Sequence, residues 1–268
     1  MIAVRVHRIR LELRLFFIAL QFLTRVPVPA WVGFEPEWLN LSARHFPLVG
    51  LLVGSVAAAV LWAGHALFTP PVAVGLSIAA TLLLTGGFHE DGWADTCDGL
   101  GGAVARERAL VIMKDSRIGA YGAMGLVLML GLKAAALVSL PWQQAVPGLL
   151  LAHTASRAAA VLLIRLLTYA GDVEHSKAKP LAQTISMAGT AVACGWVALV
   201  AILVSVEPGG VAAVATGLLL AAATTAACAR LWRRRLGGYT GDTLGATQQV
   251  AELSVLLGWL AAWRLGMG

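Results

Sequence analysis

The segment GGFHEDGWADTCDGLGGAVARERALVIMKDSRIG, from Gly86 to Gly119, lies between two strongly apolar parts of the chain. It contains six of the fourteen acidic residues in the whole sequence. A dense group of charges between apolar segments of this kind predicts a polar rim on a bundle of membrane helices. The segment therefore indicates both the fold class and the place where chemistry is expected.

The first half of the segment is acidic, with Glu90, Asp91, Asp95 and Asp98. In a helix the three aspartates fall at i, i+4 and i+7 and share one face. An exposed acidic face is the alternative, but such faces usually alternate with Lys or Arg, and residues 89–105 contain neither. Since hard oxygen ligands favour Mg²⁺, the four acids predict a magnesium site, with Mn²⁺ or Ca²⁺ as alternatives.

The second half of the segment is basic, with Lys114 and Arg117 on either side of Asp115. A glycine-rich turn at residues 99–102 lets the chain double back toward the acids. Carboxylates that hold a metal beside basic residues are typical of phosphoryl transfer. We expect Lys114 and Arg117 to bind phosphate charge, and Asp115 or an acid of the first half to accept the proton of an attacking hydroxyl.

Two stretches resemble a known family. They are HEDGWADTCDGLGG followed by ERALVIMKDSRIGAYG, within residues 89–122, and RLGGYTGDTLGATQQVAE, residues 235–252. Both are similar to the signature of the cobalamin synthase family, the adenosylcobinamide-GDP ribazoletransferases. The resemblance implies the last assembly step of cobalamin biosynthesis. In that step α-ribazole, or its 5′-phosphate, attacks the phosphorus on the cobinamide side of adenosylcobinamide-GDP, GMP leaves, and Mg²⁺ assists.

Several further residues are expected to contact the substrates. The predicted binding residues are His89, Lys114, Arg117, Arg157, Thr240 and Asp242. His89 either binds substrate or orients Glu90. Arg157 should point from its apolar span into a polar cavity, or else pair with an acid such as Glu252. The glycines of residues 237–245 suit a close approach to a ligand, and there Asp242 would complete the metal shell or hold a ribose hydroxyl.

The composition indicates a membrane protein. The chain is 59% hydrophobic and 13% charged, with a mean hydropathy of +0.79, so its charged fraction is about half that of a typical soluble domain. Seven apolar runs are candidate spans: residues 46–68, 72–88, 118–140, 146–169, 187–206, 211–229 and 250–263. We therefore predict an all-α polytopic bundle of about seven transmembrane helices, forming one integral membrane catalytic domain over residues 1–268.

The basic residues predict the orientation of this bundle. Sixteen of the twenty Lys and Arg residues lie in residues 1–45, 89–118, 170–186 and 230–249. The intervening turns at residues 69–71, 141–147 and 207–210 contain none. By the positive-inside rule, the charged loops face the cytoplasm and the protein lies in the cell inner membrane. The net charge of +6 therefore marks topology and does not indicate nucleic-acid binding.

Two polar segments are assigned to the membrane surface. Residues 4–24 alternate arginine with apolar residues, which predicts a helix lying in the lipid interface. His175, Lys177 and Lys179 either contact phosphates or only satisfy topology, and topology is the simpler interpretation. The sequence leaves open whether the protein forms a homo-oligomer.

Two other functions share some features of this sequence. A CDP-alcohol phosphatidyltransferase also displays metal-binding aspartates, but Gly102 and Ala103 stand where that family has Ala-Arg, and Asp115 is a single later aspartate. A cation transporter would place carboxylates near the middle of the membrane, whereas here only Glu252 falls within a span.

Overall fold

A computed structural model describes residues 2–171 and 182–266. The expectation for His175, Lys177 and Lys179 falls outside the described residues. Within these ranges the chain is helical, with one isolated bridge between Tyr169 and Tyr239 and no strand beyond it. The all-α prediction is confirmed.

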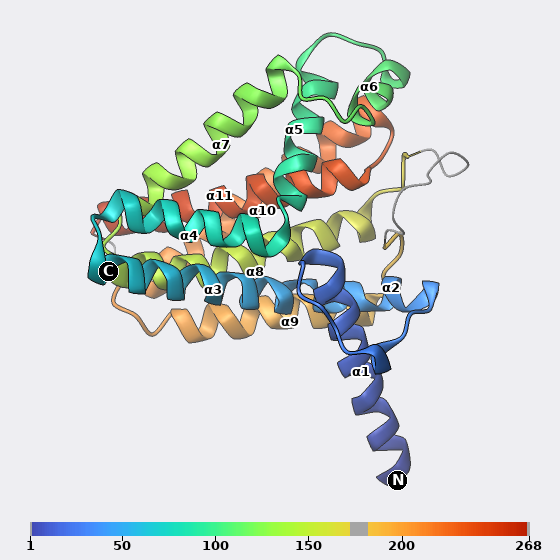
Figure 1. Cartoon of the computed structure of the whole chain (residues 1–268), viewed down its shortest axis with the longest axis horizontal. Coiled ribbons are helices and arrows are strands. Elements are labelled where there is room, and N and C mark those ends of the chain that lie inside the picture. Colours follow the sequence, from blue (N-terminus) through green and yellow to red (C-terminus); the bar gives the residue numbers. More distant parts are fainter. Residues whose placement is uncertain (1, 172–181, 267–268) are drawn as a thin grey trace.

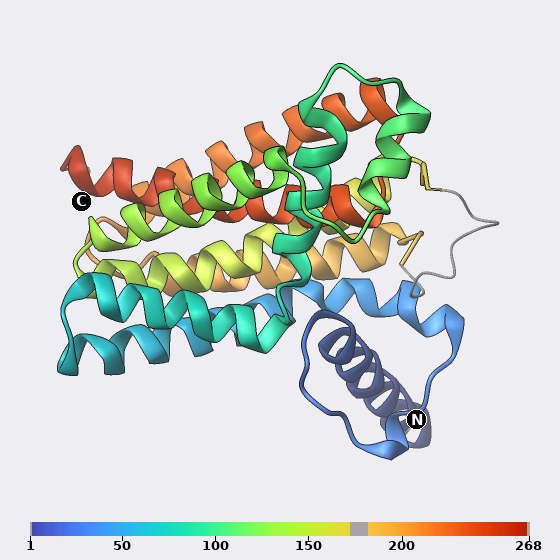
Figure 2. The ribbon, with the colours of Figure 1, turned by 45° about the horizontal axis from the view of Figure 1, so that its top comes forward.

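Seven helices run roughly along the long axis of the molecule (Figures 1 and 2). They are α3 (Phe46–Leu67), α4 (Pro70–Thr85), α7 (Ala120–Val138), α8 (Trp142–Leu166), α9 (Met187–Val204), α10 (Gly210–Leu236) and α11 (Gly241–Arg264). Each predicted apolar run corresponds to one of them. Helix α8 is the central element: it packs on α3 and α11, and 78% of its apolar window is buried, against 22% for α9.

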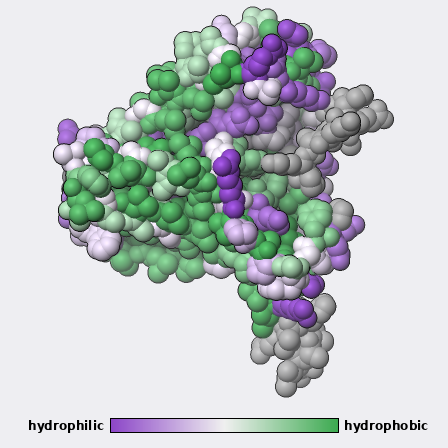
Figure 3. Space-filling view, viewed as in Figure 1, coloured by the Kyte–Doolittle hydropathy of each residue, from purple (hydrophilic) through white to green (hydrophobic). Residues whose placement is uncertain are grey.

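Fewer helices than the predicted seven meet the length and hydropathy expected of a membrane span, and the exact span count stays a prediction. In the described part of the chain, five helices are long and apolar enough to cross a bilayer, or six if α4 and the following helix form one bent span. Helix α11 is not among them, because Gln248, Gln249 and Glu252 lower its hydropathy. The protein is a multi-pass membrane protein, and Figure 3 shows apolar residues covering the flank of the bundle.

The N-terminal helix α1 (Ile2–Leu23) lies across the direction of the bundle (Figure 1). It is followed by η1 (Ala30–Val32), α2 (Pro36–Ser42) and η2 (Ala43–His45). Glu12 on α1 binds Arg44 at 3.1 Å and His45 at 2.9 Å, just before α3 begins. The helix is confirmed, and its place in the lipid interface remains a prediction.

A sharp bend separates α4 from α5 (Phe88–Gly101). Gly86 and Gly87 both have positive φ, 74° and 70°, which ends α4 and turns α5 by 90°. Helix α5 therefore crosses the end of the bundle, and the short α6 (Arg106–Met113) follows it (Figure 2). Hydrophilic residues gather around α6 (Figure 3).

Candidate active site

The acidic segment forms helix α5, as predicted, and it packs against the first turn of α11. A Cβ added to Gly92 would lie 2.9 Å from the backbone oxygen of Asp242, and one on Gly245 would lie 3.2 Å from that of His89. Only glycine allows the two backbones to approach this closely. The contact brings Asp242 to the aspartates of α5, although about 150 residues separate them in the sequence.

Negative charge accumulates at this contact. Burial raises the pKa of Asp95 to about 7, and the charges of Asp91, Asp242 and Asp98 contribute to the same shift. Burial, with a smaller effect of Asp91, also raises the pKa of Asp242 to about 6. None of the ion pairs among the described residues joins these four acids to Lys or Arg. We call Asp91, Asp95, Asp98 and Asp242 the rim acids.

The chemistry of the rim acids suits a hard cation. Their carboxylates are oxygen ligands of the type that Mg²⁺ prefers, and their mutual repulsion is what a bound cation would remove. In residues 2–171 and 182–266, however, no three His, Cys, Asp or Glu side chains converge closely enough to hold a metal ion. The donor set fits magnesium, while a coordination shell would require these side chains to move together.

Asp98 has a role that sequence reasoning missed. Its two carboxylate oxygens accept hydrogen bonds from the backbone amides of Gly119, at 2.7 Å, and Gly122, at 2.8 Å. These amides belong to the N-terminus of α7, where helix amides lack partners. Asp98 therefore fastens the basic loop that precedes α7 to α5. The glycines at 119 and 122 were the available signal, since they leave room for the carboxylate.

The basic residues of this loop are exposed. Arg117 donates two hydrogen bonds to Asp115, from Nε at 3.0 Å and from a terminal nitrogen at 2.6 Å. These bonds lower the pKa of Asp115 to about 2, which makes it a weak proton acceptor. Lys114 is exposed to solvent. The structure thus shows Asp115 bound to Arg117 and facing solvent with it.

The loop before α11 uses its polar groups locally. Thr240 caps the helix: its hydroxyl accepts from the amide of Thr243 at 3.2 Å, and its own amide donates to the hydroxyl of Thr243 at 2.7 Å. Gly238 packs against the backbone of Thr168, and Tyr239 pairs with the chain after α8. The glycines therefore serve close backbone packing here, and Asp242 is the residue of this loop that reaches the rim acids.

The whole chain can be compared with known proteins. The family model described as Cobalamin-5-phosphate synthase matches residues 15–260. The chain belongs to this family. It is 62% identical over 257 residues to the adenosylcobinamide-GDP ribazoletransferase of Leptothrix cholodnii, with 93% of this chain and 96% of the relative covered. It is 46% identical over 255 residues to the enzyme of that name from Shewanella amazonensis, with 94% and 96% covered. No solved structure matches the chain.

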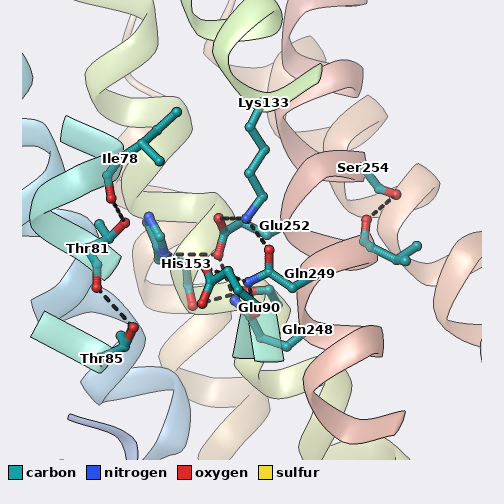
Figure 4. Close-up of polar contacts among 12 residues, drawn as sticks. Ile78, Thr81, Thr85, Glu90, Lys133, His153, Gln248, Gln249, Glu252 and Ser254 are labelled. Atoms are coloured by element: carbon teal, nitrogen blue, oxygen red, sulfur yellow. Dashed lines mark hydrogen bonds and ion pairs between the residues drawn. The ribbon is translucent and has the colours of Figure 1, made fainter. Parts of the chain in front are cut away.

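One predicted site residue of this cobalamin-5-phosphate synthase family member, Arg157, lies inside the bundle. Arg157 is 2% exposed and donates to the backbone oxygen of His153 at 3.0 Å. Its anticipated partner Glu252 is bound instead by Lys133 at 2.6 Å and by His153 at 3.0 Å (Figure 4). Arg157 thus points inward, as expected, but the suggested ion pair with Glu252 is not formed.

Glu90 and His89 also turn away from the rim acids. Glu90 accepts a hydrogen bond from Gln249 at 3.0 Å inside the bundle (Figure 4). His89 is 5% exposed and packs edge-to-face on Phe88. The helical spacing explains why Glu90 points away from the aspartates. Successive residues of an α-helix are rotated by about 100°, so Glu90 lies about 100° from Asp91 and off the face that the three aspartates share.

Proposed function

We propose that this chain joins adenosylcobinamide-GDP to α-ribazole, or to its 5′-phosphate, with release of GMP and with Mg²⁺ as cofactor. The observation that carries the proposal is the gathering of the rim acids at one end of the bundle, where no Lys or Arg of residues 2–171 and 182–266 forms an ion pair with them. This group lies in the two stretches that resemble the family signature. The relatives named adenosylcobinamide-GDP ribazoletransferase support the same reaction.

The rim acids have the first role in this proposal. Asp91, Asp95 and Asp242 would hold Mg²⁺, which would supply positive charge to the diphosphate of the donor. Asp98 holds the basic loop in place through the amides of Gly119 and Gly122. Phosphoryl transfer needs positioning and charge neutralisation more than covalent chemistry, and this arrangement offers both.

Two further roles belong to the loop before α7. Lys114 and Arg117 are exposed, and Arg117 binds Asp115 through Nε and one terminal nitrogen, so Lys114 and the remaining donors of Arg117 are accessible to the charge on the transferring and leaving phosphates. The proton of the attacking ribazole hydroxyl would pass to a rim acid rather than to Asp115. Arg117 holds the pKa of Asp115 at about 2, far below what proton abstraction near neutral pH requires.

The assay follows GMP release from protein purified in detergent. With both substrates and Mg²⁺ we expect turnover, and with EDTA in place of Mg²⁺ we expect none. Mn²⁺ should restore part of the rate, since it accepts the same oxygen ligands. Replacing the donor with a CDP-alcohol should yield no CMP. Undiminished GMP release in EDTA would reject the metal, and CMP release would favour the phosphatidyltransferase alternative.

We further propose that the end of the bundle carrying α5 and α6 faces the cytoplasm in the cell inner membrane. The concentration of Lys and Arg on the loops of this end supports it. The test is labelling of Arg108→Cys after the three native cysteines are replaced. A membrane-impermeant maleimide should label inside-out vesicles and leave intact spheroplasts unlabelled, and labelling of spheroplasts alone would reverse the orientation.

A further inference from the structure

A network of polar side chains fills the interior of the bundle between α5, α7, α8 and α11 (Figure 4). Its charged members are two acids, Glu90 and Glu252, and two bases, Lys133 and Arg157. Lys133, Arg157 and Glu252 are each less than 7% exposed. The formal charges cancel, which is the condition under which ionised groups persist away from water.

Gln249 connects this network to α5. Its side-chain oxygen accepts from Lys133 at 2.6 Å, and its nitrogen donates to Glu90 at 3.0 Å and to the oxygen of Gln248 at 2.8 Å. The orientation of the amide follows from its neighbours, because an ammonium group can only donate. The oxygen must face Lys133, so the nitrogen must face Glu90.

The second carboxylate oxygen of Glu90 is buried and has no hydrogen-bond partner. It lies beside an internal cavity of about 20 Å³, whose polar lining is Glu90, Lys133, His153, Glu252, Ser77 and Thr81. Six apolar residues complete the lining, and the space has room for one water molecule, which these polar side chains would bind. Lys133 uses two of its three N–H donors, on Gln249 and Glu252, and keeps one for such a water.

The Glu90–Gln249 hydrogen bond joins the two helices that carry the rim acids. Glu90 precedes Asp91 on α5, and Gln249 lies two turns after Asp242 on α11. We propose that Gln249, Lys133 and one buried water hold Glu90 inside the bundle and thereby fix Asp91 and Asp95 opposite Asp242. Gln249 and Glu90 are then positioning residues, and the statement rests on the proposed function of the rim acids.

An exchange of the two side chains tests this. Glu90→Gln and Gln249→Glu should each lower kcat for GMP release about tenfold and raise the Mg²⁺ concentration for half-maximal rate, because each leaves an unmatched pair across the helix contact. The double variant Glu90→Gln/Gln249→Glu keeps the charge, the hydrogen bond between residues 90 and 249 and an acceptor for Lys133, and it loses the donor to Gln248. It should recover activity to within about threefold of the unaltered protein.

Gln144→Glu is the matched control. Gln144 is another buried glutamine, and it binds Trp259 at 3.1 Å toward the other end of the bundle. A carboxylate there should lower the thermal unfolding midpoint in detergent and leave kcat and the Mg²⁺ requirement unchanged. This separates general loss of stability from loss of positioning.

The outcomes are distinct. If the double variant is as impaired as Glu90→Gln alone, the carboxylate of residue 90 is itself needed at the metal and the positioning role is rejected. Unchanged kinetics in both single variants would reject it as well. If the unaltered protein releases no GMP with any metal, the proposed function fails. Unfolding midpoints without metal then decide the network separately: they should fall in each single variant and recover in the double.

Discussion

The rim acids and the interior acids are close in space but have different neighbours. Glu252, inside the bundle, is bound by Lys133, His153 and Gln248, each within 3.0 Å. Asp95, at the end of the bundle, has no ion pair in the described part of the chain, and partial burial together with the charges of Asp91, Asp242 and Asp98 raises its pKa to about 7. Inside the bundle Lys133 supplies the opposite charge, whereas at the rim no Lys or Arg of residues 2–171 and 182–266 pairs with these acids.

This difference separates structural from functional charge. A partly buried carboxylate that lacks an opposite charge and lies near other carboxylates destabilises the fold, so selection for stability alone would favour its removal or pairing. The repulsion among the rim acids persists in the folded chain, and a ligand that brings positive charge would relieve it. This difference can be tested with substitutions in both regions. Substitutions of the rim acids should mainly lower activity, and substitutions of the interior charges should mainly lower stability.

The largest effect is expected at Asp95. Asp95→Asn keeps the shape of the side chain and removes its charge, so we expect GMP release to fall by about 10³-fold or more while the protein stays folded. Turnover and the thermal unfolding midpoint should be measured together. Glu107→Gln, an exposed acid of α6, is the control and should keep its activity. An active Asp95→Asn variant would remove the distinction between the two regions.

The interior should respond in the opposite way. Lys133→Met removes the ammonium group 2.6 Å from Glu252, which leaves a buried carboxylate with an incomplete set of partners. We expect a loss of about 3–5 kcal/mol in the free energy of unfolding. Adding Glu252→Gln to Lys133→Met should recover much of it, since the carboxylate charge that Lys133 balanced is then removed as well. Chemical denaturation in detergent provides the measurement, and equal stability of the single and double variants would contradict the pairing.

Asp98 should behave differently from the other rim acids. An asparagine has one acceptor oxygen, so Asp98→Asn leaves the amide of Gly119 or Gly122 without a partner. We expect the loop to loosen, trypsin to cleave faster after Lys114 and Arg117, and GMP release to fall about tenfold. Asp91→Asn should leave the cleavage rate unchanged. Equal cleavage of the two variants would mean that Asp98 does not fasten the loop.

The smallest effect concerns pH. The folded-state pKa of Asp95, about 7, lies above its unfolded value of 3.8, so ionisation disfavours the fold increasingly as pH rises through this interval. In EDTA, Asp95→Asn should therefore unfold at a higher temperature than the unaltered protein at pH 8, by about 2–4 °C per kcal/mol removed. The difference should vanish near pH 4. A difference independent of pH would show that Asp95 is not the group that titrates.

Much of the fold follows from the sequence. All seven apolar runs are helices, and the three aspartates of the acidic segment share one face of α5, because hydrophobic runs and helical spacing are local properties. The exact span count stays a prediction, since neither α11, which is rich in polar groups, nor α4, with 16 residues, by itself meets the length and hydropathy expected of a span. The packing of α11 against α5 cannot be read from its composition.

The details of the site follow less well from the sequence. The sequence alone does not distinguish the partners of these acidic residues. In the structure Asp98 binds helix amides, Glu90 binds Gln249, and Asp115 binds Arg117. These assignments depend on which backbone lies opposite each carboxylate, and that is settled by packing between distant segments. A helical wheel places Glu90 off the aspartate face, although the acidic pattern alone groups it with the expected metal ligands, and Gly92 and Gly245 lie at the close contact of α5 with α11.

The bend at Gly86 and Gly87 also limits the length of helix α4. Helix α4 has 16 residues, about 24 Å at 1.5 Å per residue, whereas the hydrocarbon core of a typical bilayer is about 30 Å thick. If the turn between α3 and α4 reaches the far surface, α5 and its aspartates lie below the headgroups unless the surrounding lipid thins. Bilayer thickness then becomes a control on the enzyme, and turnover in vesicles should fall as the acyl chains of the lipid are lengthened.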